Sequence, residues 1–391
     1  MRRDFLLLLW GTAAAFAGFA PLLSVVPLWA ADGGAGSGGV GATTGVLMGT
    51  TVAVQLAMPR LLRVLTLRRA SVVGALLLGA PTFAYLLSSD VAWVLAVSAV
   101  RGVGFGMFVV AGSALVAELV PPERRGRSLG AYGVAIGVPQ ALLLPIGVWA
   151  AEQLGFAVVF VATGGVGVLG AVVLLGIRES GRTADTDDAP APVAADPPEP
   201  VRYRTLAGSG VLLLVASVAF GGATSFVPLA FSAGTASAVL LAVSVTMTVG
   251  RWWAGVRADS EGVGGLLPLA IGACAVGTLG IALAAGALDG GLALVAASAA
   301  GLLYGLGFGA LQNDTLVLMF RDAGPGGTGT ASAAWNIAYD GGTGAGSLGV
   351  GFVAQGVGVS AGLGVAALPL LAVLPHAVRR ARAARDAVGP R

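Results

Sequence analysis

The sequence contains no lysine, a single cysteine and a single histidine, and only 10% of its 391 residues are charged. Soluble domains carry about 25% charged residues, so this chain cannot cover a water-facing surface. Soluble enzymes, nucleic-acid-binding proteins and disordered proteins are excluded on that ground. A lone cysteine allows neither an internal disulfide nor a cysteine-based metal site. Without lysine there is no G-x-x-x-x-G-K-[ST] phosphate loop for ATP, and we expect no cofactor, no metal and no enzymatic activity.

What the sequence has in abundance points to a lipid bilayer as its partner. Hydrophobic residues make up 56% of the chain, glycine occurs 63 times, and the mean hydropathy is +0.89. A transmembrane helix needs about 20 apolar residues, and small residues allow such helices to approach closely. Twelve segments meet this requirement, near residues 5–30, 40–59, 70–88, 91–119, 127–150, 156–177, 206–230, 236–256, 264–286, 291–320, 327–354 and 360–376. The sequence therefore predicts an all-α membrane protein with twelve transmembrane helices.

The placement of arginine predicts the orientation of these spans. Arginine and lysine concentrate on the cytoplasmic side of membrane proteins. With the N-terminus inside, 21 of the 22 basic residues fall in cytoplasmic stretches, and the exception, Arg101, lies inside the fourth span. We therefore expect a multi-pass protein of the plasma membrane with both termini in the cytoplasm.

One polar segment divides the chain into two parts. Residues 179–205 are acidic and proline-rich, and such a composition predicts a disordered linker that serves as a tether. The linker separates an N-terminal six-helix bundle, residues 1–178, from a C-terminal six-helix bundle, residues 206–376. Residues 377–391 form a basic tail, which we expect to attract anionic lipid.

The two parts also resemble each other in sequence. With a shift of 203 residues, the fourth and fifth spans fall on the tenth and eleventh without a gap. The matched residues include Gly102 with Gly305, Gly104 with Gly307, Phe105 with Phe308, Gly106 with Gly309, Pro122 with Pro325, Gly126 with Gly329 and Tyr132 with Trp335. This agreement predicts two pseudo-symmetric bundles, which can rock against each other and expose a central cavity to one side at a time.

The twelve spans, the six-plus-six duplication and the central loop resemble the major facilitator superfamily (MFS). The segment that ends at Gly262 is similar to the family's cytoplasmic G-x-x-x-D-R-x-G signature, in which Gly255, Asp259 and Gly262 fit and Ser260 replaces the arginine. The resemblance implies a cytoplasmic latch, in which Asp259 accepts hydrogen bonds from the N-terminus of the fifth span.

Two further motifs bear on the mode of transport. The segment from Arg101 to Gly106 resembles the R-x-G pattern of proton-coupled members. The segment from Gly130 to Pro139 partly resembles the glycine-proline motif of drug and metabolite exporters, although Val138 separates Gly137 from Pro139. Close helix packing through small residues is the alternative reading of the second motif.

Charged residues within the spans are functional candidates, because a charge is costly in the membrane. Asp340 lies near the middle of the eleventh span, and Asn336, four residues earlier, shares its helix face. A buried carboxyl group there can take up and release protons or handle substrate; a structural hydrogen-bond network is the alternative.

Other candidates are less specific. Asp314, next to Asn313 in the tenth span, can line an inner vestibule or pair with Arg321. Arg101 can bind an anion, contact Asp340 or bond to backbone carbonyl groups. Four further residues can line the cavity or serve packing alone: Gln140, Tyr304, Trp335 and Tyr339.

These features predict a monomeric secondary transporter that moves a small organic solute by alternating access. Proton-coupled efflux is the favoured mode, and an uptake symporter or a uniporter of the same fold is the alternative. A non-transporting membrane sensor or assembly factor is a third possibility of another class, but the linker and tail are too short and polar to form an extra signalling domain.

Overall fold

The computed structural model describes residues 2–121, 124–178, 203–324 and 327–386, and over these residues the chain is helical. The predicted linker therefore lies almost wholly outside the described residues. The helices in chain order are α1 (Arg2–Phe19), α2 (Leu22–Asp32), α3 (Ser37–Leu61), α4 (Leu67–Gly79), the 3₁₀-helix η1 (Ala80–Leu87), α5 (Val91–Leu119), α6 (Arg125–Leu154), α7 (Phe156–Leu175), α8 (Tyr203–Ala230), α9 (Ala233–Glu261), α10 (Leu267–Ala287), α11 (Gly290–Ala323), α12 (Thr328–Val357), α13 (Val359–Val365) and α14 (Ala367–Asp386).

These helices form the predicted twelve membrane-length segments. Three segments consist of two consecutive elements each: α1 with α2, α4 with η1, and α13 with α14. The first break falls at Pro21, which lacks the N–H group that would continue α1. Eleven segments are long and apolar enough to cross a membrane by length and composition. The twelfth is α12, whose 30 residues include Asp340 and many glycine, serine and threonine residues.

The matched glycines of the internal repeat occupy matched packing positions. Gly102 on α5 lies against Leu47 and Thr50 of α3, and a Cβ atom there would overlap the carbonyl oxygen of Leu47. Gly305 on α11 lies in the same way against Val243 of α9. Glycine is required at both places because two helix backbones come into direct contact.

The second pair of matched glycines, Gly104 and Gly307, lies on the opposite side of α5 and α11. Gly104 lies against Leu78 of α4, and Gly307 lies against Ala270 of α10. The tenth span therefore sits between α9 and α10 as the fourth span sits between α3 and α4. This correspondence is the physical reason for the ungapped repeat.

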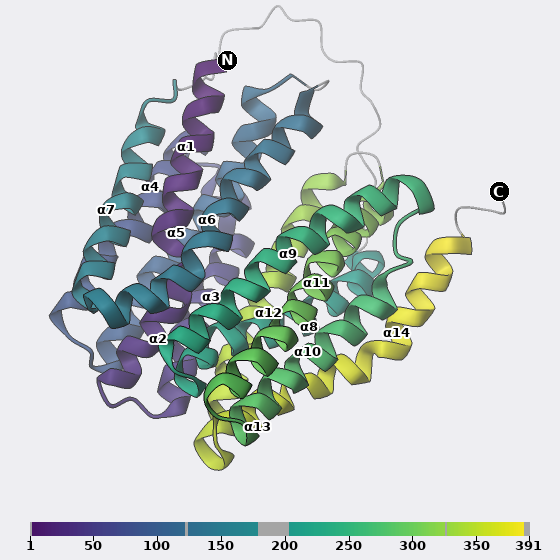
Figure 1. Ribbon diagram of the computed structural model, residues 1–391. Helices are drawn as coiled ribbons and strands as arrows, with labels where there is room; N and C mark the ends of the chain where they lie inside the picture. Colours follow the sequence, from purple (N-terminus) through teal and green to yellow (C-terminus); the bar gives the residue numbers. More distant parts are fainter. Residues whose placement is uncertain (1, 122–123, 179–202, 325–326, 387–391) are drawn as a thin grey trace, which may run out of the picture.

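The helices α1–α7, here called the first half, lie beside the helices α8–α14, the second half (Figure 1). We call the end of the molecule where α7 ends and α8 begins the linker end, and the other the far end. In Figure 1 the halves approach each other near α2 and stand apart at the linker end.

Several buried hydroxyl groups join the two halves toward the far end. Ser24 on α2 donates to the carbonyl oxygen of Thr224 on α8 at 2.8 Å. The hydroxyls of Thr44 on α3 and Ser225 on α8 lie 3.2 Å apart, and Ser347 on α12 donates to the carbonyl oxygen of Gly41 at 3.0 Å. Because these groups are buried and paired, the far end is a closed contact between the halves.

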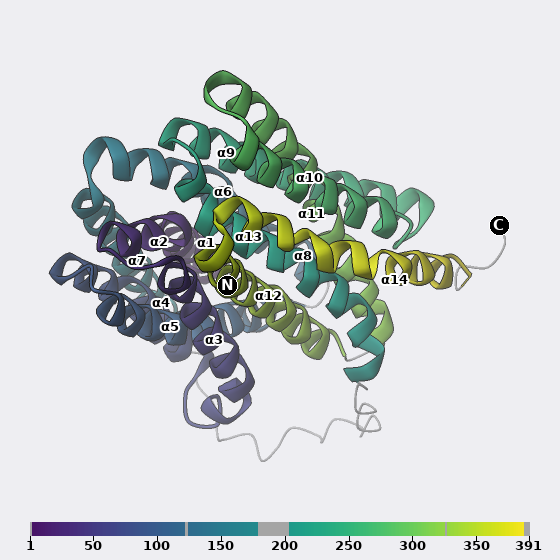
Figure 2. The same ribbon diagram turned by 90° about the horizontal axis from the view of Figure 1, so that it is seen from below.

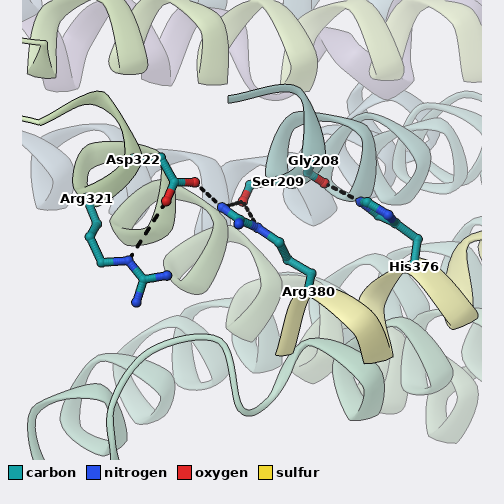
Figure 3. A network of polar contacts seen from close by, with 6 residues as sticks. All are labelled: Gly208, Ser209, Arg321, Asp322, His376 and Arg380. Carbon is teal, nitrogen blue, oxygen red and sulfur yellow. Dashed lines mark hydrogen bonds and ion pairs between the residues drawn. The ribbon is translucent and has the colours of Figure 1, made fainter. Parts of the chain in front are cut away.

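The last helix extends well beyond the predicted boundary at residue 376, because α14 ends at Asp386. Polar contacts of Arg380 and of the boundary residue His376 hold this part of α14 against other helices of the second half, as Figure 3 shows. Arg380 forms an ion pair with Asp322 at the end of α11 and donates to the hydroxyl of Ser209 on α8. His376 contacts the carbonyl oxygen of Gly208 at 2.9 Å. The first part of the expected tail is therefore a packed helix.

Candidate functional site

Asp340 lies at the contact between the halves, in the middle of α12. Its side chain is buried, at 4% exposure. The amide nitrogen Nε2 of Gln55 on α3 donates to Oδ2 of Asp340 at 2.7 Å, and Gln55 itself is only 6% exposed. Within the described part of the chain, no arginine forms an ion pair with Asp340. A single neutral amide from the other half therefore holds this carboxyl group.

Asn336 does not bond to Asp340, although the two residues share one side of α12. Its amide nitrogen donates to the carbonyl oxygen of Ser332 in the preceding turn, at 2.9 Å. The side-chain carbonyl oxygen stays available on this partly exposed residue.

Arg101 is tied to its own half. The side chain is 1% exposed, its Nε donates to the carbonyl oxygen of Leu78 at 3.1 Å, and Nη1 donates to the hydroxyl of Tyr85 at 3.5 Å. The guanidinium also lies 5.7 Å from the centroid of the Tyr85 ring, a favourable cation–π arrangement. None of the contacts described for Arg101 reaches Asp340. This geometry fits a structural tie between α5, α4 and η1.

Asp314 fixes a turn at the linker end. The carboxyl group is 2% exposed, and its Oδ2 accepts the backbone N–H of Gly264 at 3.1 Å. Gly264 belongs to the turn between α9 and α10 and has a φ of +90°, which favours glycine. Arg321 lies instead beside Asp322, at 3.9 Å. The neighbouring Asn313 faces Gly255 of α9.

Replacing Asp314 by alanine is expected to destabilise the protein by about 1–3 kcal/mol, because the buried N–H of Gly264 would lose its acceptor. Thermal unfolding of the purified protein in detergent measures the loss. Asp289→Ala is the matched control, because Asp289 makes no side-chain cap at the start of α11. Unchanged stability combined with lost transport would contradict the turn-fixing role.

The three aromatic candidates belong to one stack of rings. The rings of Trp335 and Tyr339 lie 5.5 Å apart at 12°, and those of Tyr339 and Phe308 lie 5.9 Å apart at 15°. Tyr304 stacks on Phe308 at 5.5 Å and donates its hydroxyl to the carbonyl oxygen of Ala216 at 2.9 Å. Tyr304 and Trp335 lie at the two ends of the stack and are both buried, whereas Tyr339 lies inside the stack and is partly exposed.

Gln140 makes a second contact between the halves. It lies on α6, and its side chain hydrogen-bonds with Tyr339 on α12. Amide side chains from α3 and α6 therefore meet adjacent residues, Asp340 and Tyr339, on α12. The structure brings Gln140, Tyr339 and Asp340 together and leaves Arg101 and Asp314 apart from them.

Arg251 is the main functional residue that the sequence does not reveal, because its place near the end of the eighth span groups it with the cytoplasmic arginines. The helix α9 continues past it to Glu261. Its Nη1 donates to Oε1 of Gln312 on α11 at 3.4 Å, and its guanidinium lies 5.8 Å from the centroid of the Trp335 ring. Arg251 therefore contacts residues of both α11 and α12.

The internal repeat contains the signal that would have found both Gln55 and Arg251. Thr50 lies against Gly102, and Thr246 lies against the equivalent Gly305. Counting five residues onward from each threonine gives Gln55 and Arg251. The two residues thus occupy equivalent positions on α3 and α9.

The predicted latch is only partly described. Gly255 lies inside α9, and Gly262 ends that helix with a φ of +86°, while its N–H donates to the carbonyl oxygen of Ala258 at 3.2 Å. The side chain of Asp259 lies outside the described part of the chain. The latch of Gly255, Asp259 and Gly262 stays a prediction.

Twelve membrane-length helices in two equivalent halves, with polar residues where the halves meet, define a polytopic transport protein. The sequence profile of the Major Facilitator Superfamily matches residues 8–347, and the chain belongs to this family. It is therefore a multi-pass membrane protein and a secondary transporter that works by alternating access, not an enzyme.

Solved structures share the fold at low sequence identity. A bacterial homologue of the human lysosomal transporter Spinster, in an inward-facing and unoccupied conformation, matches with a TM-score of 0.74 and 13% identity over 98% of this chain and 97% of that one. The peptide transporter POT in complex with sulfate matches with a TM-score of 0.68 and 16% identity, over 96% and 95%. The human organic anion transporter TETRAN matches with a TM-score of 0.62 and 17% identity, over 96% and 99%.

Among the curated proteins, none matches this sequence. The likeness to solved structures shows the fold alone.

Proposed function

We propose that the protein exports a small organic solute in exchange for protons, and that Asp340 is the group that binds the proton. The observation that carries this proposal is the position of the carboxyl group: it is buried on α12, at the contact between the halves, and its hydrogen bond comes from the opposite half. An ionisable side chain at such a place within a membrane is a candidate for a proton path.

The bond between Gln55 and Asp340 supplies a way to join proton binding to a change of conformation. With Asp340 ionised, the amide of Gln55 makes a charge-assisted hydrogen bond at 2.7 Å, roughly twice as strong as a neutral one. Proton binding removes the charge and weakens this link between α3 and α12. Because the proton then has different affinities for the two arrangements of the halves, its binding shifts the equilibrium between them.

The orientation and direction belong to the same proposal. The arginine distribution supports a plasma-membrane protein whose linker end and both termini face the cytoplasm. Export rests on the partial match of the segment Gly130 to Pro139 to the exporter motif. We further propose that the protein acts as a monomer, since both halves of the transport path come from one chain.

Replacing Asp340 by asparagine tests the proposal. Purified protein in liposomes with a pH dye inside and an imposed proton gradient is presented with a panel of organic compounds. We expect solute-dependent proton movement in the wild type to fall to background in Asp340→Asn, because the variant has no titratable group there, while solute exchange persists. Asp289→Asn, at an exposed position at the start of α11, is expected to behave like the wild type.

Other outcomes point to specific alternatives. Equal proton movement in the wild type and in Asp340→Asn would remove Asp340 from the proton path. Proton movement in the same direction as the solute would identify a symporter. Solute movement in the wild type without any proton movement would identify a uniporter.

A further inference from the structure

The two junctions between the halves carry different residues at two pairs of equivalent positions. Gln55 on α3 meets Asp340 on α12. The equivalent residues are Arg251 on α9 and, with the shift of 203 residues, Gly137 on α6. Figure 2 shows α6 beside α9, and these two helices are in contact. One junction between the halves thus has an amide facing a carboxyl group, whereas the other has a guanidinium and a glycine.

The face of α6 at this second junction is open although it points inward. No atom lies within 4 Å of the place where a Cβ would stand at Gly133 or Gly137. Helical spacing puts both glycines on the same side of α6 as Leu144, which is fully buried. Val134 and Val138 lie on the other side and are exposed, as residues facing lipid would be. The glycines therefore border space between the halves.

The charge of Arg251 is not matched by a carboxylate. Among the described residues it contacts the carbonyl oxygen of Gln312 and the ring of Trp335, and it forms no ion pair. The residue as a whole is exposed, but its charged end is largely shielded from water, and over the described ranges it makes only the one hydrogen bond to Gln312. Gln312 is only 3% exposed, and its amide nitrogen has no hydrogen-bond partner in the described part of the chain. A cation in a membrane without a counter-ion is costly, and a bound anion would remove that cost.

An aromatic surface borders the same space. Trp335 lies under the guanidinium of Arg251, and the nearly parallel Tyr339 continues the stack and reaches Gln140 on α6. Offset-stacked rings are a favourable arrangement for aromatic groups. Tyr339 is stacked between Trp335 and Phe308, and the other face of Trp335 lies on the guanidinium, so a ligand can meet only the edges of these rings. An aromatic body packs favourably with its face against such edges. The place therefore offers a cation for an anionic group, ring edges for an aromatic body, and an amide to orient the ligand.

We propose that the space between α6, α9 and α12 is the binding site for the solute, and that it takes compounds with a carboxylate on a planar aromatic body. The carboxylate binds Arg251, the ring packs against the edges of Trp335 and Tyr339, and the missing side chains of Gly133 and Gly137 provide the room. This assignment rests on the proposed transport function and names the substrate class of that function.

Binding to the purified protein in detergent tests the site separately from transport. The probes are 1-naphthoate and benzoate, with 1-naphthylmethylamine and 1-naphthamide as cationic and neutral counterparts of the same ring, and binding is measured by calorimetry. We expect the two carboxylates to bind, the larger ring more tightly, and the amine and amide to bind at least tenfold more weakly. Arg251→Gln should weaken 1-naphthoate at least tenfold, and Arg251→Lys should recover part of the loss.

A second variant fills the space beside α6 and leaves Arg251 unchanged. Gly137→Leu is expected to abolish binding of 1-naphthoate. The control is Gly165→Leu, the same change at an exposed glycine of α7 that also has no atom within 4 Å. Arg257→Gln removes an arginine from the same helix, one that stacks on Trp253, and should leave binding unchanged.

The outcomes separate this site from the proposed function. Equal binding of the carboxylates and the amine, unchanged binding in Arg251→Gln, or no carboxylate binding at millimolar concentration would each overturn the site. Carboxylate binding that depends on Arg251 in a protein that shows no transport in liposomes would uphold the site and contradict the function. Proton-coupled transport of neutral compounds that is unaffected by Arg251→Gln would uphold the function and contradict the site.

Discussion

A disulfide between Thr44→Cys and Ser225→Cys is expected to reduce transport to background, and a reducing agent should restore it. The two hydroxyl oxygens lie 3.2 Å apart, on α3 of the first half and α8 of the second. Disulfides join Cβ atoms about 3.5–4.5 Å apart, which suits side chains whose terminal atoms already touch. Because alternating access requires the far end to open, a covalent link there holds the transporter in one state. Solute uptake into liposomes before and after reduction measures the effect.

A second disulfide provides the matched control. Ser225→Cys combined with Ser347→Cys joins residues of the same half, whose hydroxyl oxygens lie 2.7 Å apart. This pair shares one substitution with the test pair but does not bridge the halves, so transport should survive oxidation. The native Cys274 is buried and interferes with neither pair. Full transport by a completely cross-linked Thr44→Cys/Ser225→Cys protein would contradict movement at this contact.

Gly305→Leu is expected to prevent recovery of folded protein. A Cβ at this position would overlap the carbonyl oxygen of Val243 and the hydroxyl of Thr246, so α9 and α11 would have to separate. Adding side-chain volume to a packed core commonly costs about 1–3 kcal/mol, and here backbone must move rather than a flexible side chain. We expect a loss of about 3 kcal/mol or more. The yield of monodisperse protein in size-exclusion chromatography and its unfolding temperature report the effect.

The control for this variant lies on the same helix. Gly291→Leu places the same side chain near the start of α11, where no atom lies within 4 Å. It should leave the yield and the unfolding temperature unchanged. A stable Gly305→Leu protein would show that the contact between α9 and α11 can open without loss of the fold.

The spans were predictable from sequence because each needs only length and apolar composition, and the repeat supplied the relation between the halves. Asp340 could be placed near the middle of its helix for the same reason, since depth follows from counting residues. Its partner Gln55 lies 285 positions away in the chain, and no local pattern relates the two. The sequence therefore indicated which carboxyl group is buried but not which group it meets.

Arg251 and Arg380 show a second reason why sequence alone places some residues wrongly. The sequence predicts that an arginine near the end of a span is an anchor at the membrane surface, which is its common role. In the structure, Arg251 has a tryptophan ring to lie on and Arg380 has Asp322 to pair with. Their helices continue because these partners, supplied by other helices, satisfy the charges. Only tertiary contacts could distinguish such arginines from simple anchors.

The composition of α12 also bears on how the chain enters the membrane during synthesis. A helix that leaves the insertion machinery alone must be apolar enough to dissolve in lipid, and an aspartate at its centre opposes this by about 2.5–3.5 kcal/mol. The helix α12 falls short of the composition that the other segments reach, but it lies between α8 and α3, both synthesised earlier. We therefore expect its entry to depend on those helices as a polar docking partner, and insertion of the second half to require that the first half is already in place.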